Sequence, residues 1–173
     1  MSSRIALTLF ILSVFSCNTD RNTSTSTETI NSSVQDPLPL PTEVVFTTLN
    51  MEEKKIAPDR LSFINFWATW CVPCIREMPS LRKMMDKSGK SIDYYIASYE
   101  SIEKVREFAS SSGSDLPFVI FDDSRIPQDF QTSLLPYTVI MKGDSLLYSK
   151  TGATEWSEGP EFLKIQSIIR ANK

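Results

Sequence analysis

The feature that most constrains this fold is a cysteine pair, Cys71 and Cys74, set between an apolar run and an amphipathic segment. The run before the pair, residues 61–67, is almost entirely apolar, aromatic or β-branched, which is typical of a strand covered on both faces. The segment after it, residues 71–87, predicts a helix, because apolar residues recur at spacings of three and four: Ile75, Met78, Leu81, Met84 and Met85. The cysteines are therefore expected at the start of a helix that follows a central strand.

This placement gives the pair a chemical rationale. The partial positive charge and unpaired N–H groups of a helix N-terminus favour a thiolate on Cys71, and Cys74 lies one turn later, close enough to form a disulfide. If the pKa of a cysteine falls from about 8.5 to about 7, the thiolate fraction at neutral pH rises from roughly 3% to roughly 50%. We therefore expect Cys71 to be the nucleophile and Cys74 the resolving thiol. Pro73 removes one N–H between them and should influence the redox potential.

The rest of the chain alternates strand and helix patterns and predicts an α/β protein with a central mixed sheet flanked by helices. Ser101 is expected to cap the second helix and Gly113 to end it. The predicted strands are 44–49, 91–97, 116–121, 137–141 and 145–151, and the remaining predicted helices are 101–111 and 158–170.

Composition excludes several function classes. The 173 residues are 41% hydrophobic and 23% charged, which fits one globular domain. A net charge of −3 with scattered basic residues argues against nucleic acid as a partner. The absence of histidine excludes Ser-His-Asp and Cys-His catalysis and every metal site that needs imidazole.

Two structural interpretations of the cysteine pair are less favoured. A zinc site needs four ligands, and neither a second cysteine pair nor a histidine is present to complete one, so no metal is expected. A purely structural disulfide would close a loop of so few residues that it restrains the unfolded chain little.

The amino-terminal segment predicts export. Residues 1–4 are positively charged and residues 5–15 are apolar, a run too short to span a membrane but typical of a signal peptide. Residues 14–17 resemble the lipobox of bacterial lipoproteins, although Val14 and Phe15 depart from its usual residues, and this resemblance implies that Cys17 carries lipid. The alternative is an ordinary secretory signal in which Cys17 has no special role.

Three segments follow from this interpretation. Residues 1–17 are expected to be a lipoprotein-type signal peptide ending at an acylated Cys17, and residues 43–173 a folded domain. Residues 18–42, rich in Ser, Thr, Asn and Pro, have too few large apolar residues to fold and are expected to be a disordered tether. A merely tolerated tail would have the same composition.

Residues 63–79, with Trp70 directly before the cysteines and Pro79 five residues after them, resemble the active-site segment of membrane-anchored thioredoxin-like proteins of the TlpA/ResA type. Residues 134–140 and 151–153 resemble later motifs of that family, so the resemblance extends over about the last 130 residues. It implies a thioredoxin fold and thiol-disulfide oxidoreductase activity.

The resemblance also implies roles for single residues. The Leu135–Pro136 peptide bond is expected to be cis and to lie beside the disulfide, with the backbone of Leu135 free to pair with an extended client. An ordinary trans proline at a strand start is the alternative. Tyr137 departs from the family, which commonly has threonine there.

Two carboxylates match acidic residues that family members use near the cysteines, namely Glu77 and Glu100. A partly buried carboxylate next to a thiol has a raised pKa and can act as general base for Cys74. The alternatives are a solvated helix residue at 77 and a cap at 100. Asn65 stands where thioredoxin itself has a buried aspartate, and asparagine is usual in the TlpA/ResA type.

The leading hypothesis is an enzyme without cofactor that reduces disulfides of other exported proteins in the cell envelope, anchored to a membrane by lipid on Cys17. The resemblance implies a membrane thiol reductase as electron donor and apocytochrome c as one client class, and hence a role in cytochrome c maturation. Alternatives are a net oxidase or isomerase, whose direction the sequence does not decide, and a redox-inert peptide-binding module. A peroxidase is less favoured, because Thr69 is too close to Cys71 for a Thr-x-x-Cys motif.

Overall fold

Seven strands and three α-helices make up the fold in the computed structural model, which describes residues 44–122 and 134–172. These residues lie within one compact unit, Pro37–Lys173. The strands are β1 (Val45–Thr48), β2 (Glu53–Lys55), β3 (Leu61–Phe66), β4 (Asp93–Ser98), β5 (Phe118–Ile120), β6 (Tyr137–Lys142) and β7 (Ser145–Thr151). The helices are α1 (Val72–Ser88), α2 (Ile102–Ser112) and α3 (Gly159–Ala171), and a short 3-10 turn, η1 (Gly89–Ser91), follows α1.

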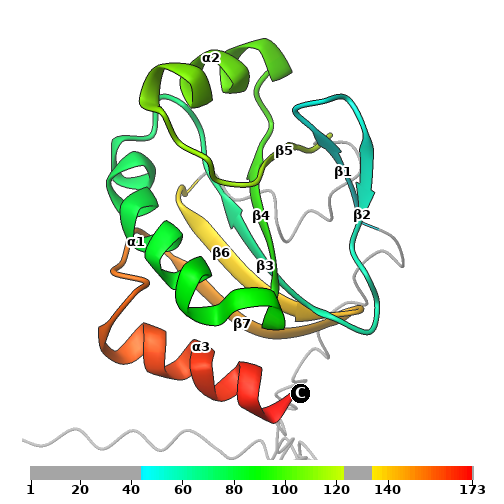
Figure 1. Cartoon of the computed structure of the whole chain (residues 1–173), viewed down its shortest axis with the longest axis vertical. Coiled ribbons are helices and arrows are strands. Elements are labelled where there is room, and N and C mark those ends of the chain that lie inside the picture. Colours follow the sequence, from blue (N-terminus) through cyan, green and yellow to red (C-terminus); the bar gives the residue numbers. More distant parts are fainter. Residues whose placement is uncertain (1–43, 123–133, 173) are drawn as a thin grey trace, which may run out of the picture. The chain divides into compact units, whose positions relative to one another are not determined.

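The strands form one mixed sheet in the order β2-β1-β5-β4-β3-β6-β7 (Figure 1). β3 pairs in parallel with β4 and antiparallel with β6, and all six of its residues are buried. The predicted central strand is thus confirmed, and the helix that connects β3 to β4 is α1, which begins directly after the cysteine loop.

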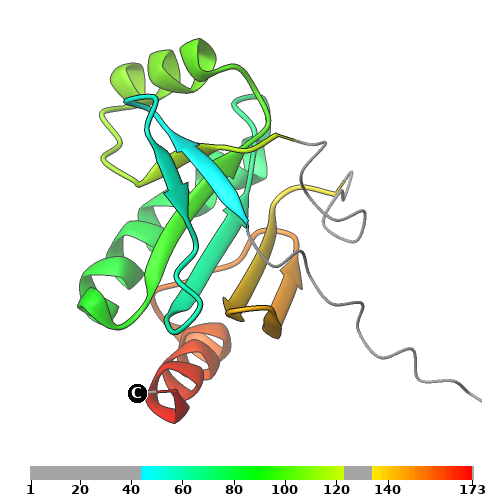
Figure 2. The same ribbon diagram turned by 90° about the vertical axis from the view of Figure 1, so that its right-hand side faces the viewer.

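Side chains alternate between the two faces of β3, as strand geometry requires. Leu61, Phe63 and Trp67 belong to an apolar cluster to which all three helices contribute. Ile64 and Phe66 belong to a second cluster, whose described members come from strands and the residues beside them. Figure 2, with the β1–β2 hairpin turned toward the viewer, shows α1 to the left of the strands and β6 and β7 to the right. By the same alternation Asn65 points to the α1 side.

Local signals account for the helix boundaries. Cys71 is the N-cap of α1, and its side chain accepts a hydrogen bond from the backbone N–H of Cys74. Ser101 caps α2 by accepting from Lys104 N at 3.5 Å, and α2 ends at Gly113, whose φ of +64° is in the left-handed region. Both predicted boundary residues of α2 are therefore confirmed.

The sequence analysis missed two elements, β2 and η1. β2 consists of Glu53, Lys54 and Lys55, which show no apolar alternation, and it forms only because it pairs with β1 across a turn that holds Met51 at a φ of 66°. η1 continues α1 past Gly89. The predicted α/β class with a central mixed sheet is confirmed. Along the described ranges no helix combines the length and apolar character that crossing a membrane requires.

Candidate active site

The two cysteines form a disulfide at the start of α1. Their Sγ atoms are 2.02 Å apart and their Cα atoms 5.3 Å apart. Cys71 Sγ also accepts a hydrogen bond from Cys74 N at 3.3 Å, and Pro73 occupies the first turn of the helix. The sulfur of Cys71 therefore lies at the positive end of α1, where a backbone donor already points at it.

The pair is buried, while apolar side chains near it in the sequence are exposed. Cys71 is 4% exposed and Cys74 1%, so the first cysteine is the more accessible of the two. Trp70 and Val72, on either side of Cys71, are 62% and 54% exposed. Leu134, which precedes the Leu135–Pro136 segment, is 64% exposed. Cys71 is thus flanked in the chain by two exposed apolar side chains.

The Leu135–Pro136 peptide bond is cis, as the family resemblance implied. Pro136 immediately precedes β6, whose first residue, Tyr137, pairs with Phe66 at the end of β3. Pro136 therefore lies at the same edge of the sheet as the loop that carries the cysteines. Its carbonyl accepts a hydrogen bond from Gly152 N at 2.8 Å, which ties it to the end of β7. The Tyr137 ring stacks on Phe66 at a centroid distance of 6.1 Å.

Glu77 lies on α1 one turn beyond Cys74 and is only 4% exposed, which contradicts the alternative of a solvated helix residue. Its Oε1 accepts from Asn65 Nδ2 at 2.8 Å, and its Oε2 accepts from Thr154 N at 3.1 Å and from Trp156 Nε1 at 2.9 Å. Burial raises the pKa of Glu77, while the three hydrogen bonds act in the opposite direction. Glu77 is thus a buried carboxylate with a raised pKa, as a general base for Cys74 requires.

Glu100 is also buried, but its partners differ. Its Oε2 accepts from Thr69 N at 2.5 Å, and its Oε1 accepts from Thr69 Oγ1 at 3.0 Å and lies 3.7 Å from Lys104 Nζ. These bonds hold the backbone and the hydroxyl of Thr69, two residues before Cys71. Glu100 therefore fixes the loop that carries Cys71, and it caps neither neighbouring helix, because the N-caps of α1 and α2 are Cys71 and Ser101.

Three members of the Glu77 network escaped the sequence analysis: Thr138, Thr154 and Trp156. Asn65 Nδ2 donates to Thr138 Oγ1 at 2.9 Å as well as to Glu77, and it therefore links β3, α1 and β6. These three residues lie 73 to 79 positions from their partners. No local pattern marks them, because only the folded chain brings them together.

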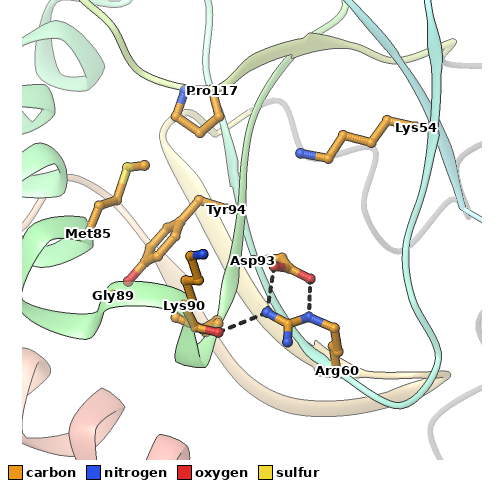
Figure 3. A pocket seen from close by; sticks show the side chains of 9 residues that line it. Lys54, Arg60, Met85, Gly89, Lys90, Asp93, Tyr94 and Pro117 are labelled. Carbon is orange, nitrogen blue, oxygen red and sulfur yellow. Dashed lines mark hydrogen bonds and ion pairs between the residues drawn. The ribbon is translucent and has the colours of Figure 1, made fainter.

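A hollow of about 470 Å³ lies at the other end of the sheet, near the end of α1 and the start of β4 (Figure 3). Arg60 there donates to both carboxylate oxygens of Asp93, at 2.7 and 2.8 Å, and to the carbonyl of Lys90 at 2.9 Å. The Asp93 carboxylate balances the charge of the guanidinium, and the bonds join the beginnings of β3 and β4. The residues that line the hollow include no cysteine, and the ion pair there lowers the pKa of Asp93.

Several predicted features lie outside the described residues. These are the signal peptide at 1–17, the lipidated Cys17 and the tether at 18–42. They remain predictions from the sequence.

Comparison with known proteins places this geometry in context. Residues 43–143 match the model of the AhpC/TSA family. The chain is 32% identical over 100 residues to the thioredoxin-like protein YneN of Bacillus subtilis, covering 54% of this chain and 58% of that protein. It is 27% identical over 111 residues to the thiol-disulfide oxidoreductase ResA of Bacillus cereus, covering 61% of this chain and 64% of that protein.

The structural comparison agrees. The crystal structure of StoA from Bacillus subtilis superposes with a TM-score of 0.62 at 18% identity, covering 75% of this chain and 98% of that one. At such identity the likeness concerns the fold alone. The chain spans about three fifths of the length of the curated relatives it matches.

Proposed function

The chain belongs to the AhpC/TSA family, and from this we propose that it is a thiol-disulfide oxidoreductase that reduces disulfides of exported proteins through Cys71 and Cys74. The thioredoxin-like fold and the resemblance to ResA-type proteins that the sequence predicted are both confirmed. The observation that carries the proposal is the disulfide at the helix start, with Cys71 as N-cap accepting the N–H of Cys74.

The reaction follows from the positions of the two sulfurs. In the reduced protein the Cys71 thiolate attacks one sulfur of a client disulfide, so that a mixed disulfide forms and the first client thiolate leaves. Cys74 then loses its proton to Glu77, and its sulfur attacks Cys71 Sγ. The second client thiolate leaves, and the Cys71–Cys74 disulfide closes. The client gains two electrons and the chain loses two.

The partners follow from this balance. Each turnover leaves the protein oxidised, so a dithiol donor must restore the pair, and a membrane thiol reductase is the donor that the family resemblance favours. The clients we propose are exported proteins with accessible disulfides, apocytochrome c among them. The leader pattern at 1–17 supports a location outside the cytoplasm, with the chain held at a membrane by lipid on Cys17.

Mixed-disulfide trapping tests the assignment in cells that express the full chain. Cys74→Ser removes the resolving thiol, so we expect client proteins to accumulate on Cys71 as bands that disappear with reductant on gels. Cys71→Ser is the matched control, since it alters the same pair but removes the nucleophile, and it should trap nothing. Equal trapping by both variants would reject the roles given to the two sulfurs.

The same cells test the anchor. The chain should fractionate with membranes, and Cys17→Ser should release it to the soluble fraction without altering the activity of the purified protein. A Cys17→Ser protein that stays with membranes would contradict lipidation at this residue.

A further inference from the structure

The loop between β7 and α3, residues 152–158, supplies two of the three hydrogen bonds that hold Glu77. Thr154 N and Trp156 Nε1 both donate to Oε2, at 3.1 and 2.9 Å. The same loop begins with Gly152, whose N–H donates to the carbonyl of Pro136. One short segment is thus hydrogen-bonded to both the Glu77 carboxylate and the cis proline, Pro136.

Trp156 is fixed on several sides and has no exposed surface. Its ring packs edge-on against Phe63 of β3 at a centroid distance of 5.3 Å. Its backbone N–H donates to Ser80 Oγ at 3.1 Å, and that hydroxyl donates to the carbonyl of Glu77 at 2.8 Å. Trp156 is therefore hydrogen-bonded to α1 through both its backbone N–H and its indole N–H, and packing against Phe63 fixes the direction of the indole.

The donors divide unequally between the two oxygens of Glu77. A carboxylate oxygen offers about two acceptor positions. Among the described residues, Oε2 accepts two N–H groups, which fill both its positions, whereas Oε1 accepts one, from Asn65 Nδ2. A proton that arrives at this carboxylate is therefore received on Oε1.

We propose that Trp156 is a positioning residue of the reaction: its indole N–H occupies Oε2 of Glu77 and so directs Oε1 to take the proton of Cys74. The inference rests on the proposed function, in which Glu77 is the base for the resolving cysteine. The proposal adds Trp156, a loop residue 79 positions from Glu77, which controls the orientation of this base and the pH at which it becomes charged.

The groups that face the Glu77 carboxylate are uncharged on every neighbouring element except its own. Asn65 of β3, and Thr138 of β6 behind it, are neutral, as are Thr154 and Trp156. Glu155, in the same loop, is turned to the backbone and hydroxyl of Ser157. On α1 itself Cys74, one turn before Glu77, titrates only when the disulfide is open. In the oxidised protein Glu77 is therefore the titratable group, among the described residues, that is hydrogen-bonded to the Trp156 indole.

Nuclear magnetic resonance of the oxidised chain tests this without any substitution. The indole N–H resonance of Trp156 should titrate with pH at the same midpoint as the side-chain carbon of Glu77, above the ordinary range of a carboxyl group. The other two tryptophans are internal controls: Trp67 donates to the carbonyl of Ile96, and Trp70 is exposed. Glu77→Gln should abolish the Trp156 titration.

Trp156→Phe then tests the effect on the reaction. It keeps a ring against Phe63 but removes the donor, and a hydrogen bond to a charged group is worth enough to raise the Glu77 midpoint by about one to two pH units. The pH profile of the resolving step should move upward by the same amount, and no such movement should occur when Glu77 is already Gln. Trp67→Phe, which removes another buried indole N–H, should leave the midpoint in place.

The outcomes are separable. A flat Trp156 resonance while Glu77 titrates, or an equal shift caused by Trp67→Phe, would overturn the positioning role and leave the proposed function intact. If Trp156→Phe does not fold, the titration of the wild-type indole against Glu77→Gln decides. Failure of the wild-type protein to reduce any disulfide would overturn the proposed function, and the titration, which needs no turnover, would still report the contact.

Discussion

At the scale of single residues, the site depends on one ionisable group inside the apolar core. Taking a carboxylate out of water is costly unless its lone pairs are satisfied. Glu77 meets this condition through three neutral donors, and the remaining effect of burial raises its pKa. A base near a thiol at neutral pH benefits from this compromise, because its proton affinity approaches that of the thiol.

Glu77→Gln is expected to slow the resolving step about 10²-fold at neutral pH, the lower end of the range for general acid–base catalysis. In the wild type the rate should rise as pH rises through the raised pKa of Glu77, because the carboxylate form is the base. The variant should lack this rise and respond only near the thiol pKa of about 8.5. The rate is measured by stopped-flow spectroscopy on a mixed disulfide between Cys71 and an aromatic thiol. Attack by Cys74 releases the aromatic thiol, whose absorbance reports the resolving step.

Glu100→Gln is the matched control, since it changes a second buried carboxylate that contacts Thr69 rather than the Glu77 network. It should not move the midpoint of the pH profile. A shift equal to that of Glu77→Gln would show that Glu77 had been wrongly identified as the base.

The raised pKa of Glu77 also makes the free energy of unfolding depend on pH. A carboxyl group whose folded pKa is raised stabilises the fold below its unfolded pKa, and this contribution is lost as pH rises through the folded pKa. Glu77→Gln should remove this loss.

At the scale of elements, caps and turns determine where strands and helices end. α2 begins at the Ser101 cap and ends at Gly113, while β6 and β7 are joined by a turn that contains Gly143. Gly143 has a φ of +59°, and a Cβ there would lie 3.1 Å from the carbonyl oxygen of Pro58. At Gly113, with a similar φ of +64°, a Cβ would have no atom within 4 Å.

These two glycines form a matched pair for a stability prediction. Gly113→Ala should lower the free energy of unfolding by about 1 kcal/mol, the cost of a left-handed conformation for a residue with a Cβ. Gly143→Ala has the same backbone cost plus a contact with an immobile backbone atom, so we expect a loss of about 2 to 3 kcal/mol. Denaturant unfolding of both variants measures the difference. Equal losses would show that the hairpin moves away from Pro58 easily.

At the scale of the whole molecule, the sheet brings distant segments to one edge. The cysteine loop follows β3, the cis proline precedes β6 and the loop of Trp156 follows β7, and these three strands are neighbours in the sheet. The Arg60–Asp93 pair lies at the opposite end of β3 and β4. Redox chemistry and this ion pair are therefore separated by the length of the strands.

If the protein acts as a reductant, its oxidised form should be more stable to unfolding than its reduced form. The disulfide closes so short a loop that in the chain-entropy model it destabilises the unfolded state by only about 2 kcal/mol, the low end of the usual range. We expect the oxidised protein to have the higher free energy of unfolding by about that amount. By the thermodynamic cycle, a fold that favours the disulfide makes its dithiol the stronger reductant.

Chemical denaturation with and without reductant measures the two values. A variant with both Cys71→Ser and Cys74→Ser is the control, and reductant should not affect its unfolding. A reduced form more stable than the oxidised form would contradict net reduction and favour an oxidase.

Local sequence patterns were enough to predict most of the helices and strands and the reactive cysteine pair. Residues 61–67 and 71–87 predicted a buried strand and a helix because their patterns are local, and both are present as β3 and α1. Cys71 at the helix start and the boundaries of α2 were likewise predictable, since each depends on residues a few positions apart. The family resemblance added the cis proline.

The different surroundings of the two carboxylates become visible only in the folded chain. Glu77 and Glu100 were equivalent candidates in the sequence, and they differ because one accepts from Asn65 and Trp156 while the other holds Thr69. β2 formed from charged residues for the same reason: its partner strand, and no pattern of its own, makes it a strand. Hydrogen bonds between segments 12 to 79 residues apart depend on how the strands are ordered, and that order is a property of the folded chain.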